Sequence, residues 1–141
     1  MLLSIGFLFA DTEFAKPLPS IENPRKFVFP ITSDKEGEIS HVLSSASNVM
    51  KFYGPNKCEV AIVCYSKGIK AILKDAHFFD KDIQKKVKSL MTYDVEFIAC
   101  KNTLNTYKIS NKEVLDGVTF VTAGIVELIE RQKRGWIYIR P

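Results

Sequence analysis

Cys100 has the sequence surroundings that a reactive thiol needs. It ends an apolar run and is followed at once by Lys101, Asn102 and Thr103. A cation and a helix amino terminus both lower the pKa of a nearby thiol, and the thiolate is the form that acts as a nucleophile. Asn and Thr are good residues for starting a helix, so the amide groups downstream are expected to face the sulfur. The spacing therefore predicts Cys100 as a nucleophile, with Lys101, Asn102 and Thr103 around it.

The other two cysteines, Cys58 and Cys64, are expected to be structural, because free cysteine is among the most buried residue types. The same interpretation is open for Cys100. Cys58 and Cys64 lie six residues apart in one extended segment, so their Cα atoms are about 20 Å apart. A disulfide spans at most about 7 Å, which excludes a bridge between them. If the chain is exported, Cys64 is the nearer candidate partner for Cys100, and one cysteine is left over.

A turn after another apolar run offers a second set of binding groups. Ser66, Lys67 and Gly68 follow the run at 59–65. A strand-to-helix turn presents backbone N–H groups that can hold an anion, and Lys67 adds a positive charge. Lys67 and Gly68 are therefore predicted binding residues, although a turn of this kind can also serve only to reverse the chain.

Other chemistries leave little trace in the chain. Neither His41 nor His77 belongs to an HExxH motif and there is no CxxC pair, so neither a metal site nor a cofactor is predicted. The GxSxG motif and the phosphate loop GxxxxGKS/T are absent as well. The net charge of +4, from 20 basic and 16 acidic residues, is mild and scattered. This disfavours nucleic-acid binding, because neutralising phosphates needs clustered Lys and Arg.

Two patterns alternate along the chain from residue 26 onward. Short apolar runs predict strands at 26–31, 59–65, 94–100, 118–122 and 136–139. Apolar residues at helical spacing predict helices at 36–53, 66–73, 80–93, 102–107, 111–115 and 123–134. Strands interleaved with helices imply right-handed crossovers. The predicted fold is a single three-layer α/β domain with a central, mainly parallel five-stranded sheet and helices on both faces.

This fold gives each strand an expected place. The run at 59–65 should be central, because it is apolar almost throughout, and Pro30 suggests that the first strand lies at an edge or ends there. Ligands of open α/β sheets bind outside the carboxyl ends of the strands. Cys64 and Cys100 both fall at that edge.

The amino-terminal part of the chain divides into two segments ahead of a domain at 26–141. Residues 1–10 are apolar but too few to span a membrane, which takes about 20 residues. They are expected to be either a secretory signal or an apolar arm. The protein is periplasmic or otherwise exported if they are cleaved as a signal, and cytoplasmic if not. Residues 11–25 contain three prolines and are expected to form an extended linker.

The later part of the chain carries longer motifs. VEFIACKNTL, at 95–104, and the closing TAGIVELIERQKRGWIYIRP resemble the DsrE/DsrF-like family, where the forms are V-x-F-x-x-C-x-N-T-L, P-S-G-V-x-E-L-x-x-L-Q and G-x-x-Y-I-K-P. Residues 122–125 stand where P-S-G-V is usual, and Arg140 replaces the Lys of K-P. The tetrapeptide YSKG at 65–68 stands where the family often has H-G-K-G, so the histidine is missing there. The resemblance covers residues 25 to 141.

This resemblance implies a compact three-layer domain that forms homo-oligomers, commonly trimers or hexamers. Members of the family that relay sulfur carry it as a persulfide on a cysteine and work with dedicated partner proteins. The cysteine that matches the family motif here is Cys100. Apolar residues at 136–139, together with Phe78 and Phe79, are expected to be buried in part at a subunit interface.

Two functions of different classes follow. In the first, a sulfur carrier or sulfurtransferase-like protein accepts sulfane sulfur on Cys100 as a persulfide, and Lys101, Lys67 and the helix amino terminus stabilise the thiolate. In the second, a non-catalytic homo-oligomer binds a small anion at the subunit or strand-end cleft, and Cys100 serves for packing. The reactivity of Cys100 distinguishes the two.

Overall fold

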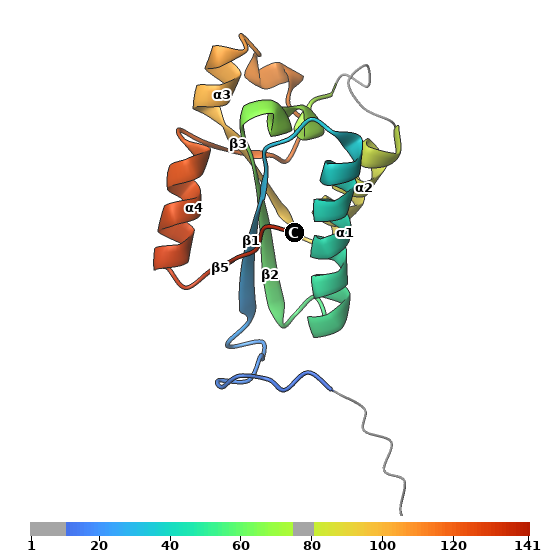
Figure 1. Cartoon of the computed structure of the whole chain (residues 1–141), viewed down its shortest axis with the longest axis vertical. Coiled ribbons are helices and arrows are strands. Elements are labelled where there is room, and N and C mark those ends of the chain that lie inside the picture. Colours follow the sequence, from blue (N-terminus) through green and yellow to red (C-terminus); the bar gives the residue numbers. More distant parts are fainter. Residues whose placement is uncertain (1–10, 75–80) are drawn as a thin grey trace, which may run out of the picture.

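A five-stranded parallel sheet forms the centre of the protein, whose computed structural model describes residues 11–74 and 81–141 (Figure 1). The strands lie in the order β4-β3-β2-β1-β5, and every neighbouring pair is parallel. Their bounds are β1 Arg25–Ile31, β2 Cys58–Cys64, β3 Glu96–Cys100, β4 Thr119–Val121 and β5 Ile137–Tyr138. The α/β fold with a parallel sheet is therefore confirmed.

Helices connect the strands at the predicted places. The α-helices are α1 Glu36–Tyr53, α2 Lys81–Thr92, α3 Lys101–Thr106 and α4 Gly124–Lys133. The segment predicted as a helix at 66–73 is a 3-10 helix, η1 (Ser66–Ile72), and a second one, η2, spans Asn111–Glu113. A 3-10 helix has tighter turns than an α-helix and is used for short connections, which suits this position between a strand end and the layer beside the sheet.

The two faces of the sheet are covered unequally (Figure 1). Helices α1 and α2, together with η1, pack on one face around the larger apolar cluster, which includes Phe29, Ile62 and Phe97. Helix α4 lies on the other face over a smaller cluster. The buried residues of that smaller cluster are Val28, Ala61, Val63, Ile98 and Leu128. Strands alternate their side chains between the two faces, so every second residue of a central strand faces α4.

The central position predicted for β2 is observed, since β2 pairs with β1 on one side and with β3 on the other. Strand β1 is not the edge strand, because β5 pairs with its Phe27 and Val28. Pro30 lies beyond that pairing and faces only Val63 of β2. Proline cannot donate a backbone hydrogen bond, and in this place none is needed on the β5 side.

The segment ahead of β1 is held against the amino-terminal end of the sheet. Arg25 donates two hydrogen bonds, at 2.8 Å to the carbonyl of Pro17 and at 2.6 Å to that of Ala15. The ring of Phe14 lies 5.9 Å from that of Phe52, near the end of α1. Residues 1–10 and the segment with His77, Phe78 and Phe79 lie outside the described residues. Among the helices that are described, none is both long and apolar enough to cross a membrane.

Candidate functional site

Cys100 is placed where a strand, a helix start and a second helix meet. It is the last residue of β3 and the N-cap of α3, with an extended backbone at φ −79° and ψ 113°. Its side chain is 5% exposed and lies on the α4 side of the sheet, beside Gly124. The sulfur therefore sits just below the surface at the carboxyl edge of the sheet, which is where open α/β sheets bind ligands.

Hydrogen-bond donors around the sulfur set the pKa of Cys100. Burial by itself raises this pKa, but the hydroxyl of Thr103 and the N–H groups of Gly124, Thr103 and Asn102 lower it by more. Donors that bind the charged form favour that form. The net result is a pKa below the ordinary thiol value, so the thiolate is the form that this environment stabilises.

Thr103 connects two strand ends. Its hydroxyl oxygen accepts a hydrogen bond of 3.0 Å from the backbone N–H of Ser66, which lies two residues after the end of β2 at Cys64. The same hydroxyl is the largest single influence that lowers the pKa of Cys100. Ser66 has a left-handed backbone with φ 52°, which is rare for a non-glycine residue. Thr103 therefore ties the turn after β2 to the thiol at the end of β3.

Gly124 is a site residue that the sequence patterns did not single out. It is the first residue of α4, and a Cβ there would stand 3.1 Å from the Cβ of Tyr65, 3.1 Å from Cγ1 of Val63 and 3.3 Å from the Cβ of Cys100. A side chain at this position would be crowded, so glycine lets the start of α4 come this close without displacing its neighbours. The N–H groups in the first turn of a helix have no partner within the helix, so the amide of Gly124 is free to face the sulfur.

The two predicted lysines have neighbours of their own. The ammonium group of Lys101 is 5.9 Å from the ring centre of Phe120. Lys67 lines a pocket of about 330 Å³ together with Tyr107 and the ion pair between Asp34 and Lys70. The largest influences that lower the pKa of Cys100 come from neutral N–H and O–H donors and not from an ammonium group.

Gly68 has a packing role in the turn after β2. Its N–H donates to the carbonyl of Tyr65 at 3.0 Å, and the N–H of Ser66 is bound to Thr103. Two amides that could have held an anion are thus already used within the protein. A Cβ at Gly68 would overlap the carbonyl group of Ile31 and stand 2.7 Å from the nitrogen of Thr32, so the close contact between this turn and the end of β1 requires glycine.

The remaining cysteines have environments that oppose ionisation. Cys64 is fully buried, and burial raises the pKa of its thiol strongly. Burial, helped by the charge of Glu59, also raises the pKa of Cys58. All three cysteines are free. Cys64 packs in the larger cluster on the face opposite to α4, while Cys100 lies on the α4 side, so the two side chains point away from each other across the sheet.

Tyr65 lies next to Cys100, at the position where the motif H-G-K-G has its histidine. Burial raises the pKa of its phenol, and so do the nearby Tyr138 and Cys100, while Arg140 lowers it. Tyr65 and Tyr138 both pack on the cluster beneath α4. A phenol with a raised pKa keeps its proton, so Tyr65 is neutral in this environment. Within residues 11–74 and 81–141, no three His, Cys, Asp or Glu side chains gather as a metal site would require.

Comparison with known proteins identifies a matching family and several similar structures. The DsrE/DsrF-like family matches residues 25–141. MTH1491, a protein of unknown function from Methanobacterium thermoautotrophicum, is 30% identical with a TM-score of 0.75, and the match covers 83% of this chain and 99% of that one. The ychN protein from E. coli is 19% identical with a TM-score of 0.66, over 83% and 99% of the two chains.

A third structure shows the fold at lower identity. BT1422, a conserved protein of unknown function from Bacteroides thetaiotaomicron, is 16% identical with a TM-score of 0.60, over 82% of this chain and 94% of that one. No curated protein gives a significant match.

Proposed function

Because this chain belongs to the DsrE/DsrF-like family, we propose that it is a sulfur carrier or sulfurtransferase-like protein whose Cys100 accepts sulfane sulfur as a persulfide. The observation that carries the proposal is the set of donors around one sulfur atom, the hydroxyl of Thr103 and the amides of Gly124, Thr103 and Asn102. A thiol in such surroundings is a better nucleophile at neutral pH than an ordinary cysteine.

The proposed step is an exchange between two sulfur–sulfur bonds. The Cys100 thiolate attacks the outer sulfur of a hydropersulfide, R–S–SH. A bond forms between the two sulfurs, the S–S bond of the donor breaks, and its electron pair leaves on R–S⁻. Cys100 then carries S–SH. An acceptor thiolate takes that outer sulfur by the same exchange, and Cys100 leaves as the thiolate that its donors stabilise, which favours its departure.

The pH dependence of alkylation tests this proposal. Iodoacetamide should modify Cys100 of the native protein selectively, with a half-maximal rate at a pH below the roughly 8.5 of a free thiol. Above that pH the rate is level, because the cysteine is already a thiolate, and below it the rate falls as the thiolate is protonated. Peptide mass spectrometry locates the modified residue.

Two controls belong to the alkylation experiment. A Cys100→Ser variant should lose the labelled peptide, and Cys58 and Cys64 should stay unlabelled until the protein is denatured, because burial raises their pKa values. If Cys100 is inert in the native protein as well, its role is packing. The protein is then better described as a non-catalytic binder of a small anion.

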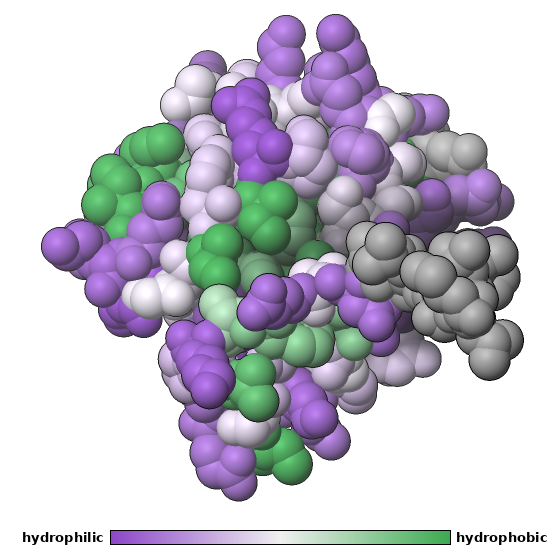
Figure 2. Space-filling view, turned by 60° about the horizontal axis from the view of Figure 1, so that its bottom comes forward, coloured by the Kyte–Doolittle hydropathy of each residue, from purple (hydrophilic) through white to green (hydrophobic). Residues whose placement is uncertain are grey.

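We also propose that the protein forms a homo-oligomer through the α4 face of its sheet. Helix α4 exposes about half of each of Ile125, Val126 and Ile129, at 55%, 49% and 51%. Figure 2 shows an apolar patch on the left, the side on which α4 lies in Figure 1. The nearby Ile137 is also exposed, whereas Trp136 and Tyr138 pack on the cluster beneath α4. Neighbouring exposed apolar residues on one helix are typical of a protein interface.

Sedimentation tests the interface. The parent protein should sediment as a trimer or hexamer at micromolar concentration, and an Ile125→Glu, Ile129→Glu double variant should shift toward the monomer, because burying two carboxylates opposes association. Ile21→Glu is the matched control, since Ile21 is 68% exposed but lies ahead of β1. A parent protein that is monomeric under these conditions would rule the interface out.

A further inference from the structure

Helix α4 turns a stripe of three buried residues toward the sheet, and these are Gly124, Leu128 and Arg131. They lie four and three residues apart, which places them on one side of an α-helix. The outer residues of the helix are exposed. The stripe therefore contains the buried residues of α4 that face the sheet, and one member of it is a charged residue.

Strand β3 presents a matching series on the same face. Glu96 binds Arg131, Ile98 packs in one cluster with Leu128, and Cys100 lies beside Gly124. The four residue steps from Glu96 to Cys100 span about 13 Å and the seven steps from Gly124 to Arg131 about 10.5 Å, so the two series have similar lengths. Helix α4 thus runs alongside β3 in the opposite direction, joined by an ion pair at one end and by the thiol at the other.

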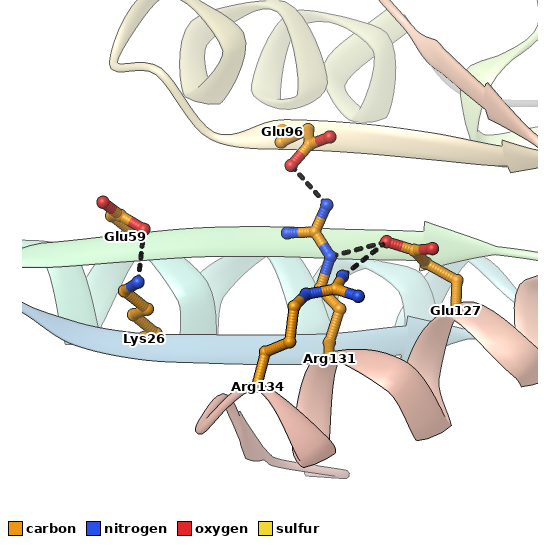
Figure 3. Close-up of polar contacts among 6 residues, drawn as sticks. All are labelled: Lys26, Glu59, Glu96, Glu127, Arg131 and Arg134. Carbon is orange, nitrogen blue, oxygen red and sulfur yellow. Dashed lines mark hydrogen bonds and ion pairs between the residues drawn. The ribbon is translucent and has the colours of Figure 1, made fainter.

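The guanidinium group of Arg131 is fixed from several sides (Figure 3). Its Nη2 is 2.7 Å from Glu96 on β3, and its Nε is 2.7 Å from Glu127 on its own helix. The ring of Trp136 lies 4.4 Å from the guanidinium carbon. The side chain is only 8% exposed. Arg134 also approaches Glu127, at 3.6 Å, but it does not reach β3.

We propose that the ion pair between Arg131 and Glu96 is a positioning device, which sets how far along β3 the helix α4 lies and so holds the amide of Gly124 at Cys100. Leu128 and Ile98 are apolar and allow small sliding movements, because apolar contact has no preferred direction. A guanidinium–carboxylate pair has a fixed geometry. The two residues act through the helix and do not touch the sulfur.

The ion pair lies at the edge of the buried region, with the Arg131 side chain 9% exposed and the Glu96 side chain 36% exposed. Such a pair contributes little net stability, because the cost of desolvating the two groups offsets much of their attraction. Its best supported use is to fix one arrangement among several similar ones. At the other end of α4, a displacement of a fraction of an ångström is enough to lengthen the hydrogen bond from the Gly124 N–H and to move the helix dipole away from the sulfur.

The test compares two arginines of one helix that share one carboxylate partner. Arg131→Met removes the pairs to Glu96 and Glu127, whereas Arg134→Met removes only an exposed contact to Glu127. The alkylation rate of Cys100 at pH 7 should fall about tenfold in Arg131→Met, as its half-maximal pH rises by about one pH unit. Arg134→Met should keep the parent profile. Glu96→Gln, which lacks the charge but still accepts a hydrogen bond, should shift the profile in the same direction by less.

A loss of stability in Arg131→Met would not by itself shift the pH profile of Cys100 alkylation. If Arg131→Met lowers the melting temperature but leaves the pH profile where the parent and Arg134→Met have it, the pair is merely structural and the proposal is wrong. If Arg131→Met does not fold, the pH profile of Glu96→Gln is compared with that of the parent in its place.

The proposal rests on the proposed function only through the choice of Cys100 as the reporter. If Cys100 is inert in the parent, hydrogen exchange at the Gly124 amide replaces alkylation. Faster exchange at Gly124 in Arg131→Met, with no change in Arg134→Met, supports the device. Equal exchange in both variants overturns it.

Discussion

A Cys100→Ser variant is expected to take up no sulfur from glutathione persulfide, whereas the parent protein gains the mass of one sulfur atom. The expectation follows from the three thiol environments. Hydrogen-bond donors lower the pKa of Cys100, burial raises that of Cys58 and Cys64, and the thiolate is the form that attacks. Intact-protein mass spectrometry under non-denaturing conditions measures the uptake.

The matched variants in that experiment are Cys58→Ser and Cys64→Ser. Both should load sulfur as the parent does, provided that they remain folded, because neither side chain lies on the α4 side of the sheet with Cys100. Undiminished uptake by Cys100→Ser would refute the assignment of the persulfide to that residue, and peptide mapping would then identify the cysteine that carries it.

Replacing Gly68 with alanine is expected to lower the free energy of unfolding by more than about 3 kcal/mol. The added Cβ would overlap the carbonyl carbon and oxygen of Ile31, and that oxygen already accepts a hydrogen bond of 3.1 Å from the N–H of Tyr65. Backbone atoms inside a parallel sheet cannot move aside as a flexible side chain can. Thermal unfolding should show a melting temperature lower by about 10 °C or more.

Gly37→Ala is the control for that substitution. Gly37 lies in the first turn of α1, and a Cβ there meets nothing within 4 Å. Alanine is the better helix former by up to about 1 kcal/mol, so this variant should be unchanged or slightly more stable. Equal stability of the two alanine variants would mean that the turn after β2 is not packed against β1 as described.

The fold could be predicted closely from the sequence where one pattern dominates locally. The helix expected at 36–53 has the observed bounds of α1, because its apolar spacing is regular and Gly54 ends it with a φ of 85°. The last strand is shorter than expected, Ile137–Tyr138, since it pairs only with Phe27 and Val28 of β1. That pairing joins segments about a hundred residues apart along the chain, and no local pattern contains it.

The candidate site could be predicted only in part, for a similar reason. Asn102 and Thr103 follow Cys100 directly, and their amides do face its sulfur. Gly124 comes to the same sulfur from another helix, so reading onward from Cys100 does not reveal it. Lys101 follows Cys100 directly and Lys67 follows Cys64, so the sequence places both at this edge of the sheet. It does not reveal that the Lys101 ammonium group lies over the ring of Phe120, because that ring comes from β4.

The hydrogen bonds that hold residues 11–24 at the amino end of the sheet determine how the protein would be displayed on a support. Arg25 binds the carbonyls of Ala15 and Pro17 there, while Cys100 closes β3 at the opposite end. A matrix attached at residue 11 would lie at the end of the sheet opposite the thiol. Immobilised molecules should present their sulfur edge outward, accessible to a partner in solution.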